Sequence, residues 1–190
     1  EELASFHKAC TEVQGQLPPF TKTMQYDVNH LIEILNSDLG RYIHRNYDGS
    51  IRHQCHSFLN NLEVLGFEEL PTIPVFVDWN IGNFTVDENM NFFSRWDYDW
   101  FRITNRVMDF YFFSRVVSLG GDQTIFSDTI DTLMEDRFIL FLQAYHRVFP
   151  LTEKEVHFIK EAYRFFILNY VIKEGDYFFH ELYASRLRME

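Results

Sequence analysis

The stretch VDWNIGNF, residues 77–84, decides how the fold of this chain is interpreted. It overlaps a short apolar run, residues 75–77, which is typical of a β-strand, and two prolines just before that run rule out a helix. Asp78 therefore comes directly after the predicted strand, and Asn83 follows five residues later. The middle of the chain is predicted to be β-rich.

The residues that follow predict a small β-hairpin. The β-type runs at residues 84–86 and 92–93 are separated by DEN at residues 87–89, and Asp and Asn favour turns. This hairpin and the strand before it form one predicted β patch.

Polar residues gather where these strands end. SRWDYDW at residues 94–100 adds Asp97 and Asp99 to Asp78 and Asn83. Unpaired buried carboxylates are costly, so something must compensate them, and Asp with Asn suits Mg²⁺. The alternative is that these residues only form turns and cap the hairpin.

The rest of the chain is predicted to be helical. Apolar residues recur at spacings of three and four, and TEKE at residues 152–155 is a capping box that begins a helix. Gly66 is expected to end another helix. Seven helices are predicted, at about residues 3–17, 24–46, 51–65, 106–119, 124–148 and 153–173, and after Gly175, with an interruption within 124–148 left open. The fold class is mainly α with a small β-hairpin patch.

Composition limits the classes of protein that fit. The 190 residues suit a single domain over 1–190, and 46% hydrophobic with 18% aromatic residues predicts an aromatic-rich core. A net charge of −11 argues against nucleic acid as a partner. No apolar run reaches the ~20 residues that span a bilayer, and no secretion signal begins the chain, so a cytoplasmic protein without membrane contact is expected.

The motifs resemble those of the aminoglycoside phosphotransferase and choline kinase family, which are small-molecule kinases of protein-kinase-like fold. Asp78 and Asn83 match the family's D-x-x-x-x-N catalytic loop, and Asp97 matches its metal-binding segment. LASFH at residues 3–7 resembles the helix after the hinge, and RVMDF at residues 106–110 resembles the next helix with its Asp. The resemblance covers essentially the whole chain, but only the family's C-terminal lobe.

This resemblance implies a role for each matching residue. Asp78 would be the catalytic base that accepts or orients the proton of the substrate hydroxyl. Asn83 and Asp97 would hold the Mg²⁺ ions that bridge the phosphates of ATP. Asp109 would tie the catalytic loop to the following helix, and Asp99 would support the site or face the substrate.

The chain also departs from the family pattern. The family's loop usually reads H-G-D-x-H-x-x-N, whereas Phe76, Val77 and Asn80 stand at its first His, its Gly and its second His. No Gly-rich phosphate loop is present, so the ATP clamp is expected in an N-terminal lobe outside this chain. Two hypotheses follow: the catalytic lobe of an ATP- and Mg-dependent phosphotransferase acting on a small-molecule hydroxyl, or a non-catalytic kinase-like binding module.

Other polar residues carry weaker signals. His53 and His56 lack a third ligand motif and are expected on a helix surface, while Cys10 and Cys55 are expected in the core. The acceptor is left open among aminoglycosides, choline, amino acids, sugars and protein side chains. A solvated face or contact with a cationic acceptor would each explain the acidic residues of the late helices, Asp128, Asp131, Glu135 and Asp136.

Overall fold

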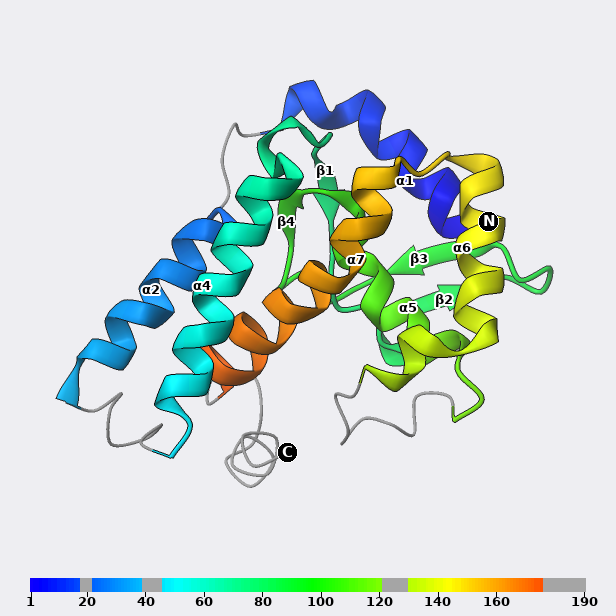
Figure 1. Cartoon of the computed structure of the whole chain (residues 1–190). Helices are drawn as coiled ribbons and strands as arrows, with labels where there is room; N and C mark the ends of the chain where they lie inside the picture. The colour runs from blue at the N-terminus through cyan, green and yellow to red at the C-terminus, as the bar shows by residue number, and fades with distance from the viewer. Residues whose placement is uncertain (18–21, 39–45, 121–129, 176–190) are drawn as a thin grey trace. The chain divides into compact units, whose positions relative to one another are not determined.

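The computed structural model describes residues 1–17, 22–38, 46–120 and 130–175 (Figure 1). The fold is mainly helical, with 67% helix, and the described residues form six α-helices and two two-stranded antiparallel sheets. The predicted fold class, mainly α with a small β part, is therefore confirmed. The chain divides into two compact units, Glu1–Thr21 with Leu70–Ile159, and Lys22–Glu69 with Lys160–Glu190. A single domain over 1–190 stays a prediction.

The first unit contains the β-rich segment and four helices, the last of them only in part. They are α1 (Glu2–Val13), α5 (Phe110–Val117), α6 (Asp136–Val148) and the beginning of α7 (Glu153–Phe166). Helix α1 packs against β1 and α6, and α5 packs against α6. Short 3-10 turns lie between them, at Gln14–Gln16, Ile81–Asn83, Arg106–Asp109 and Asp131–Met134.

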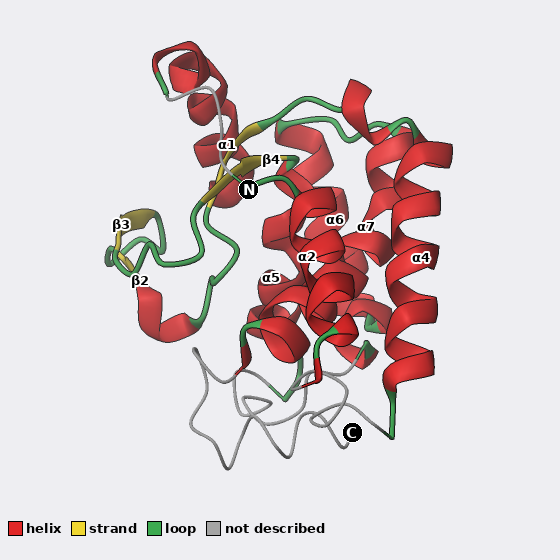
Figure 2. Cartoon of the chain, turned by 90° about the vertical axis from the view of Figure 1, so that its left-hand side faces the viewer, coloured by secondary structure: helices red, strands yellow, loops and turns green. Residues whose placement is uncertain are grey.

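Four short strands form two separate pairs, which Figure 2 shows in yellow. β2 (Phe84–Val86) pairs with β3 (Phe92–Arg95), which confirms the predicted hairpin. β1 (Ile73–Val75) pairs with β4 (Arg102–Thr104) in a sheet that the sequence did not predict. Strand β4 is too short to show an alternating pattern, and the pairing joins segments far apart in the chain.

The position of the first strand was predicted wrongly. Strand β1 ends at Val75, whereas the apolar run suggested residues 75–77. Tight turns end the strand, because the N–H of Asp78 donates to the carbonyl of Phe76 at 2.6 Å and that of Trp79 donates to Val77 at 2.9 Å. The backbone before Asp78 is therefore folded rather than extended.

The second unit is helical throughout its described part. It contains α2 (Met24–Asn36), α4 (Asp48–Leu65), a 3-10 turn at Phe67–Glu69, and a π-helix, Ile167–Lys173, that continues from α7. Figure 1 shows α2 and α4 side by side. The π-helix supplies Lys173, whose Nζ lies 2.7 Å from Oδ1 of Asp27, with both side chains buried.

Local capping signals in the sequence agree with the structure. Thr152 Oγ1 accepts the N–H of Glu155 at 3.2 Å, and Glu155 Oε2 accepts the N–H of Thr152 at 2.9 Å. This is the reciprocal pairing of a capping box. Gly66, with φ 63°, ends α4 in the left-handed conformation that glycine tolerates.

One predicted helix is shorter than expected, and another is interrupted. The helix predicted over 24–46 ends at Asn36, because Ser37 is extended and its hydroxyl donates to the carbonyl of Ile34. The segment predicted over 124–148, for which an interruption was left open, is interrupted at Glu135, where the backbone is extended before α6. Residues 39–45, Asp128 and the predicted helix after Gly175 lie outside the described residues.

The core is rich in aromatic side chains, as predicted. The largest aromatic side chains with less than 2% exposure are Trp79, Tyr145, Phe58, Phe110, Phe158 and Phe165. Among the described helices, none is long and apolar enough to cross a membrane.

The cysteines and the two histidines of α4 lie where the sequence predicts. Cys10 and Cys55 are both free and buried, and burial raises the pKa of each thiol to about 11, so both stay protonated at neutral pH. His53 and His56 are exposed on α4.

Candidate functional site

The β2–β3 hairpin brings Asn83 and Asp97 to its open end, where β2 begins and β3 ends. Phe84 and Arg95 are paired across the hairpin, and one further bond extends the ladder, from the N–H of Trp96 to the carbonyl of Asn83 at 3.0 Å. Asn83 directly precedes β2, and Asp97 follows β3 by two residues. Two residues that are 14 positions apart in sequence thus emerge from adjacent strands.

Asp78 and Asn83 contact one another directly. The Asn83 amide Nδ2 donates to Oδ2 of Asp78 at 3.0 Å, across the 3-10 turn Ile81–Asn83. The N–H of Asn80 lies 3.3 Å from Oδ1 of Asp78. Both carboxylate oxygens of Asp78 therefore have a donor from the same loop, which fixes the orientation of the carboxylate.

The environment of Asp78 favours the protonated carboxyl more than water does. Burial raises the pKa of Asp78 from its ordinary value of 3.8 to about 6, and the negative charge of Asp97 adds to this rise. The Asn80 N–H, the Arg95 guanidinium and the Asn83 amide act in the opposite direction. A carboxylate with a pKa closer to neutrality is a better proton acceptor than an ordinary exposed one.

Asp97 lies in a turn with unusual backbone geometry. Its φ is 66°, in the left-handed region, which Asp adopts more readily than most residues. The side chain is exposed, and Oδ1 accepts the N–H of Asp99 at 3.3 Å. The Asp99 side chain, two residues further along the chain, is also exposed.

Asp109 connects the segment before Asp78 to the 3-10 turn before α5. Its buried carboxylate oxygen Oδ1 accepts two backbone N–H groups, from Phe76 at 3.0 Å and from Val77 at 2.7 Å. These two residues immediately precede Asp78. The backbone that presents Asp78 is therefore held by a side chain more than 30 positions later.

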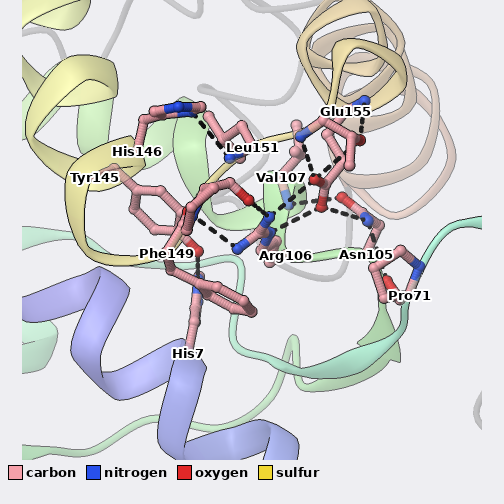
Figure 3. Close-up of polar contacts among 12 residues, drawn as sticks. His7, Pro71, Asn105, Arg106, Val107, Tyr145, His146, Phe149, Leu151 and Glu155 are labelled. Carbon is pink, nitrogen blue, oxygen red and sulfur yellow. Dashed lines mark hydrogen bonds and ion pairs between the residues drawn. The ribbon is translucent and has the colours of Figure 1, made fainter.

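A second layer of buried residues orients Asp109. Its other oxygen, Oδ2, lies 2.9 Å from Nε2 of His7 on α1. The opposite ring nitrogen of His7 lies 2.8 Å from the Tyr145 hydroxyl on α6, and Figure 3 shows the ring pointing toward that hydroxyl. His7 is fully buried and Tyr145 is 1% exposed, so two helices fix the position of this carboxylate.

The same 3-10 turn is anchored at its beginning by Arg106. Its guanidinium Nε and Nη2 both lie 2.8 Å from the carboxylate oxygens of Glu155, in the capping box of α7 (Figure 3). The guanidinium also stacks on the Phe149 ring, 3.7 Å from its centroid. A bidentate pair of this kind is rigid, so both ends of the turn that carries Asp109 are fixed.

Val77 has a φ of 60°, and its side chain is buried. A β-branched residue in the left-handed region is strained, at a cost of about 1–3 kcal/mol, and such strain gathers at functional sites. The hydrogen bond from the Val77 N–H to Asp109 helps to hold this conformation. The strained residue directly precedes Asp78.

The oxygen atoms of this site suit a divalent cation that also binds phosphate. Asn83 directs its Nδ2 to Asp78, which leaves Oδ1 as its acceptor, and Asp97 contributes an exposed carboxylate. Nowhere in the described ranges, this site included, do three His, Cys, Asp or Glu side chains gather into a metal cluster. Two carboxylates and one amide match Mg²⁺, which keeps waters and substrate phosphates among its ligands.

The structure brings together four of the five predicted site residues in one network and leaves one at its edge. Asp78 and Asn83 are in contact, Asp97 acts on the pKa of Asp78, and Asp109 holds the loop, whereas the exposed Asp99 reaches Asp97 only through its backbone.

Sequence reasoning assigned no role to His7 or Arg95. The only available signal for His7 was its place among the apolar positions of α1. Arg95 gave no signal, since a basic residue at a strand end is ordinarily exposed.

No family model, no curated protein and no solved structure matches this chain. The site is therefore interpreted from its own residues.

Proposed function

We propose that this chain is the C-terminal catalytic lobe of an ATP- and Mg-dependent phosphotransferase that acts on the hydroxyl group of a small molecule. The protein-kinase-like fold of the lobe, an N-terminal lobe that clamps ATP, and a cytoplasmic location belong to the same proposal. A cationic acceptor would suit the net charge of −11.

One observation carries the proposal. Asn83 donates to the Asp78 carboxylate at 3.0 Å, while the hairpin that begins after Asn83 returns with Asp97. The network therefore joins one carboxylate of raised pKa to an amide oxygen and a second carboxylate. Phosphoryl transfer depends mainly on positioning and on neutralising charge. Two carboxylates and an amide are the types of group that this reaction requires.

Each residue has a chemical part in this proposal. Asp78 orients the acceptor hydroxyl and takes its proton, because its carboxylate is fixed by Asn83 and the Asn80 N–H. Asn83 and Asp97 would hold the metal. When bound, Mg²⁺ neutralises the negative charge of the ATP phosphates. Asp109 keeps the segment before Asp78 in place, and Asp99 supports the turn of Asp97.

A non-catalytic binding module is the second candidate. It is favoured by Phe76, which stands where the resembled family has a His and whose ring packs against Trp79 and Tyr98. A site that lost its reaction could keep the hairpin and the Asp109 support while binding nucleotide or metal only.

The test uses the full-length protein, Mg-ATP and a panel of hydroxyl compounds, with ADP release as the measurement. Asp78→Ala is expected to reduce turnover roughly 100-fold or more, as for loss of a general base. Glu88→Ala, at the exposed tip of the same hairpin, is the matched control and should keep wild-type turnover. Wild-type turnover by Asp78→Ala would reject the assigned base. Mg-ATP binding without ADP release for any acceptor would favour the binding module.

A further inference from the structure

Arg95 is a buried arginine at the centre of this site. It is the last residue of β3, two positions before Asp97, and only 9% of it is exposed. Arginine is almost never this buried unless its charge and its N–H groups find partners. Its partners among the described residues are main-chain carbonyls and aromatic rings rather than a carboxylate.

The guanidinium donates to both loops of the site. Nη2 donates to the carbonyl of Asp78 at 2.8 Å and lies 3.4 Å from the carbonyl of Phe76, while Nη1 donates to the carbonyl of Asp97. The first two carbonyls flank the strained Val77, and the third belongs to the left-handed turn. One planar group thus joins the backbone before and at Asp78 to the backbone of Asp97.

Aromatic rings hold that group in its orientation. The guanidinium carbon lies 4.6 Å from the centroid of the Phe76 ring, 5.0 Å from Trp79 and 5.3 Å from Tyr98. The Tyr98 hydroxyl also donates to the carbonyl of Arg95 at 2.9 Å. Stacking on rings while bonding several carbonyls requires a flat, forked cation, which lysine cannot replace.

We propose that Arg95 is the positioning residue that fixes the Asp78 carboxylate relative to Asp97. The inference rests on the proposed function of the same site, because it explains how the base and the metal-holding residue keep their spacing. Without Arg95, the two loops would still be joined by the Asn83 amide and by the backbone bond from Trp96 to Asn83. The carbonyl of Asp97 would lose the donor that Arg95 provides, and the carbonyl of Asp78 would keep only the long contact from the Asn83 amide at 3.4 Å.

A buried arginine is ordinarily paired with a carboxylate, and Arg106 is an arginine of that kind in the same chain. Arg106 is 4% exposed, lies in the same compact unit and also stacks on a ring, but it bonds Glu155 and carbonyls at the end of α6. Replacing either arginine by methionine keeps an apolar stem and removes every donor. Both variants should lose stability, but only Arg95→Met should release the two loops.

The first measurement is backbone amide exchange by mass spectrometry on the full-length protein without metal. In Arg95→Met, peptides covering residues 76–80 and 96–100 are expected to exchange at least about tenfold faster than in the wild type. Arg106→Met acts on residues 76–80 through the turn that carries Asp109, so it should leave the peptide covering 96–100 at the wild-type rate. Arg95→Lys keeps the charge and provides a second variant, and it should resemble Arg95→Met because one ammonium cannot bond both loops.

The second measurement is Mn²⁺ affinity in the presence of ATP, followed by electron paramagnetic resonance. Arg95→Met and Arg95→Lys should bind Mn²⁺ roughly tenfold more weakly, the usual result of losing a residue that orients a metal ligand. Added ethylguanidinium should restore much of the affinity in Arg95→Ala, because it fills the vacated space between the rings. It should have no effect on Arg106→Ala.

The outcomes separate the positioning role from the proposed function. Wild-type exchange of both peptides in Arg95→Met, or faster exchange with unchanged Mn²⁺ affinity, would overturn the positioning role. Faster exchange in Arg95→Met, with neither Mn²⁺ binding nor ATP turnover by the wild type, would uphold the link between the loops and reject the phosphotransferase.

Discussion

The Asp109 carboxylate accepts the backbone N–H of Val77 at 2.7 Å, on the residue directly before Asp78. The same oxygen accepts the N–H of Phe76, and the other oxygen is paired with His7. One buried side chain therefore satisfies two backbone donors in a segment that belongs to no strand or helix. The position of Asp78 depends on that side chain as much as on its own loop.

Asp109→Ala should destabilise the chain strongly, because two backbone N–H groups and Nε2 of His7 lose their hydrogen-bond partner. Each orphaned buried donor costs about 1–3 kcal/mol, so a total loss of roughly 3–5 kcal/mol is expected. Urea unfolding at pH 7 measures it. Asp99→Ala, which changes an exposed carboxylate in the same region, is the control and should stay near wild-type stability. Equal stability of both variants would contradict the role of Asp109.

At Val77, the glycine variant should be more stable than the alanine variant, which is the reverse of the usual order of stability. Glycine is ordinarily about 0.5–1 kcal/mol less stable than alanine in regular structure, but it adopts positive φ without strain. Because Val77 has a φ of 60°, Val77→Gly is expected to be more stable than Val77→Ala by about 1 kcal/mol. The matched pair is Val75→Gly and Val75→Ala in β1, where alanine should be the more stable. The same order at both positions would contradict strain at Val77.

Local signals made much of the fold predictable. The capping box of Thr152 and Glu155, the glycine that ends α4 and the turn of the hairpin all lie within a few residues of what they control. The hairpin also predicted that Asn83 and Asp97 would lie near one another, because short loops fix strand pairing.

The rest depends on contacts that spacing cannot encode. Helix α2 ends at Asn36 although apolar residues continue beyond it, and strand β4 exists only because β1 pairs with it. Similarly, Arg95 is buried because two carbonyls and two rings of residues 76–79 pack around it, together with the nearby carbonyl of Asp97 and ring of Tyr98. A single sequence contains the residues of such a site but not the distances that make them act together.

Asp78→Asn should raise stability at neutral pH while removing any activity. The pKa of Asp78 is raised to about 6 in the folded chain, so the folded state favours the protonated form. The stability that Asp78 contributes is therefore present below about pH 4 and is lost as pH rises through 6. At pH 7 the neutral asparagine should stabilise the chain by about 1–3 kcal/mol, less whatever hydrogen bonding it loses.

The measurement is thermal unfolding of wild type and Asp78→Asn from pH 4 to pH 8 in metal-free buffer. The difference in melting temperature should be near zero at pH 4 and should grow up to about pH 7. Asp87→Asn is the control of opposite sign, since hydrogen bonds from Asn91 and Asn89 lower the pKa of Asp87. It should destabilise the chain at pH 7, and a pH-independent effect of Asp78→Asn would contradict the raised pKa.

Glu155→Gln should be costly at neutral pH, because it leaves the buried Arg106 guanidinium without its counter-charge. Burial acts to raise the pKa of Glu155, but hydrogen bonds from Arg106 and Thr152 outweigh it and lower the pKa below 4.5. The stabilising effect of Glu155 is therefore present above about pH 4.5 and is lost as pH falls further. Glutamine can keep the capping box, so the expected loss of about 3–5 kcal/mol in urea unfolding reports the charge pair. The double variant with Arg106→Met removes both charges and should be more stable than Glu155→Gln alone. A double variant that loses the sum of the two single effects would show that Arg106 and Glu155 act independently.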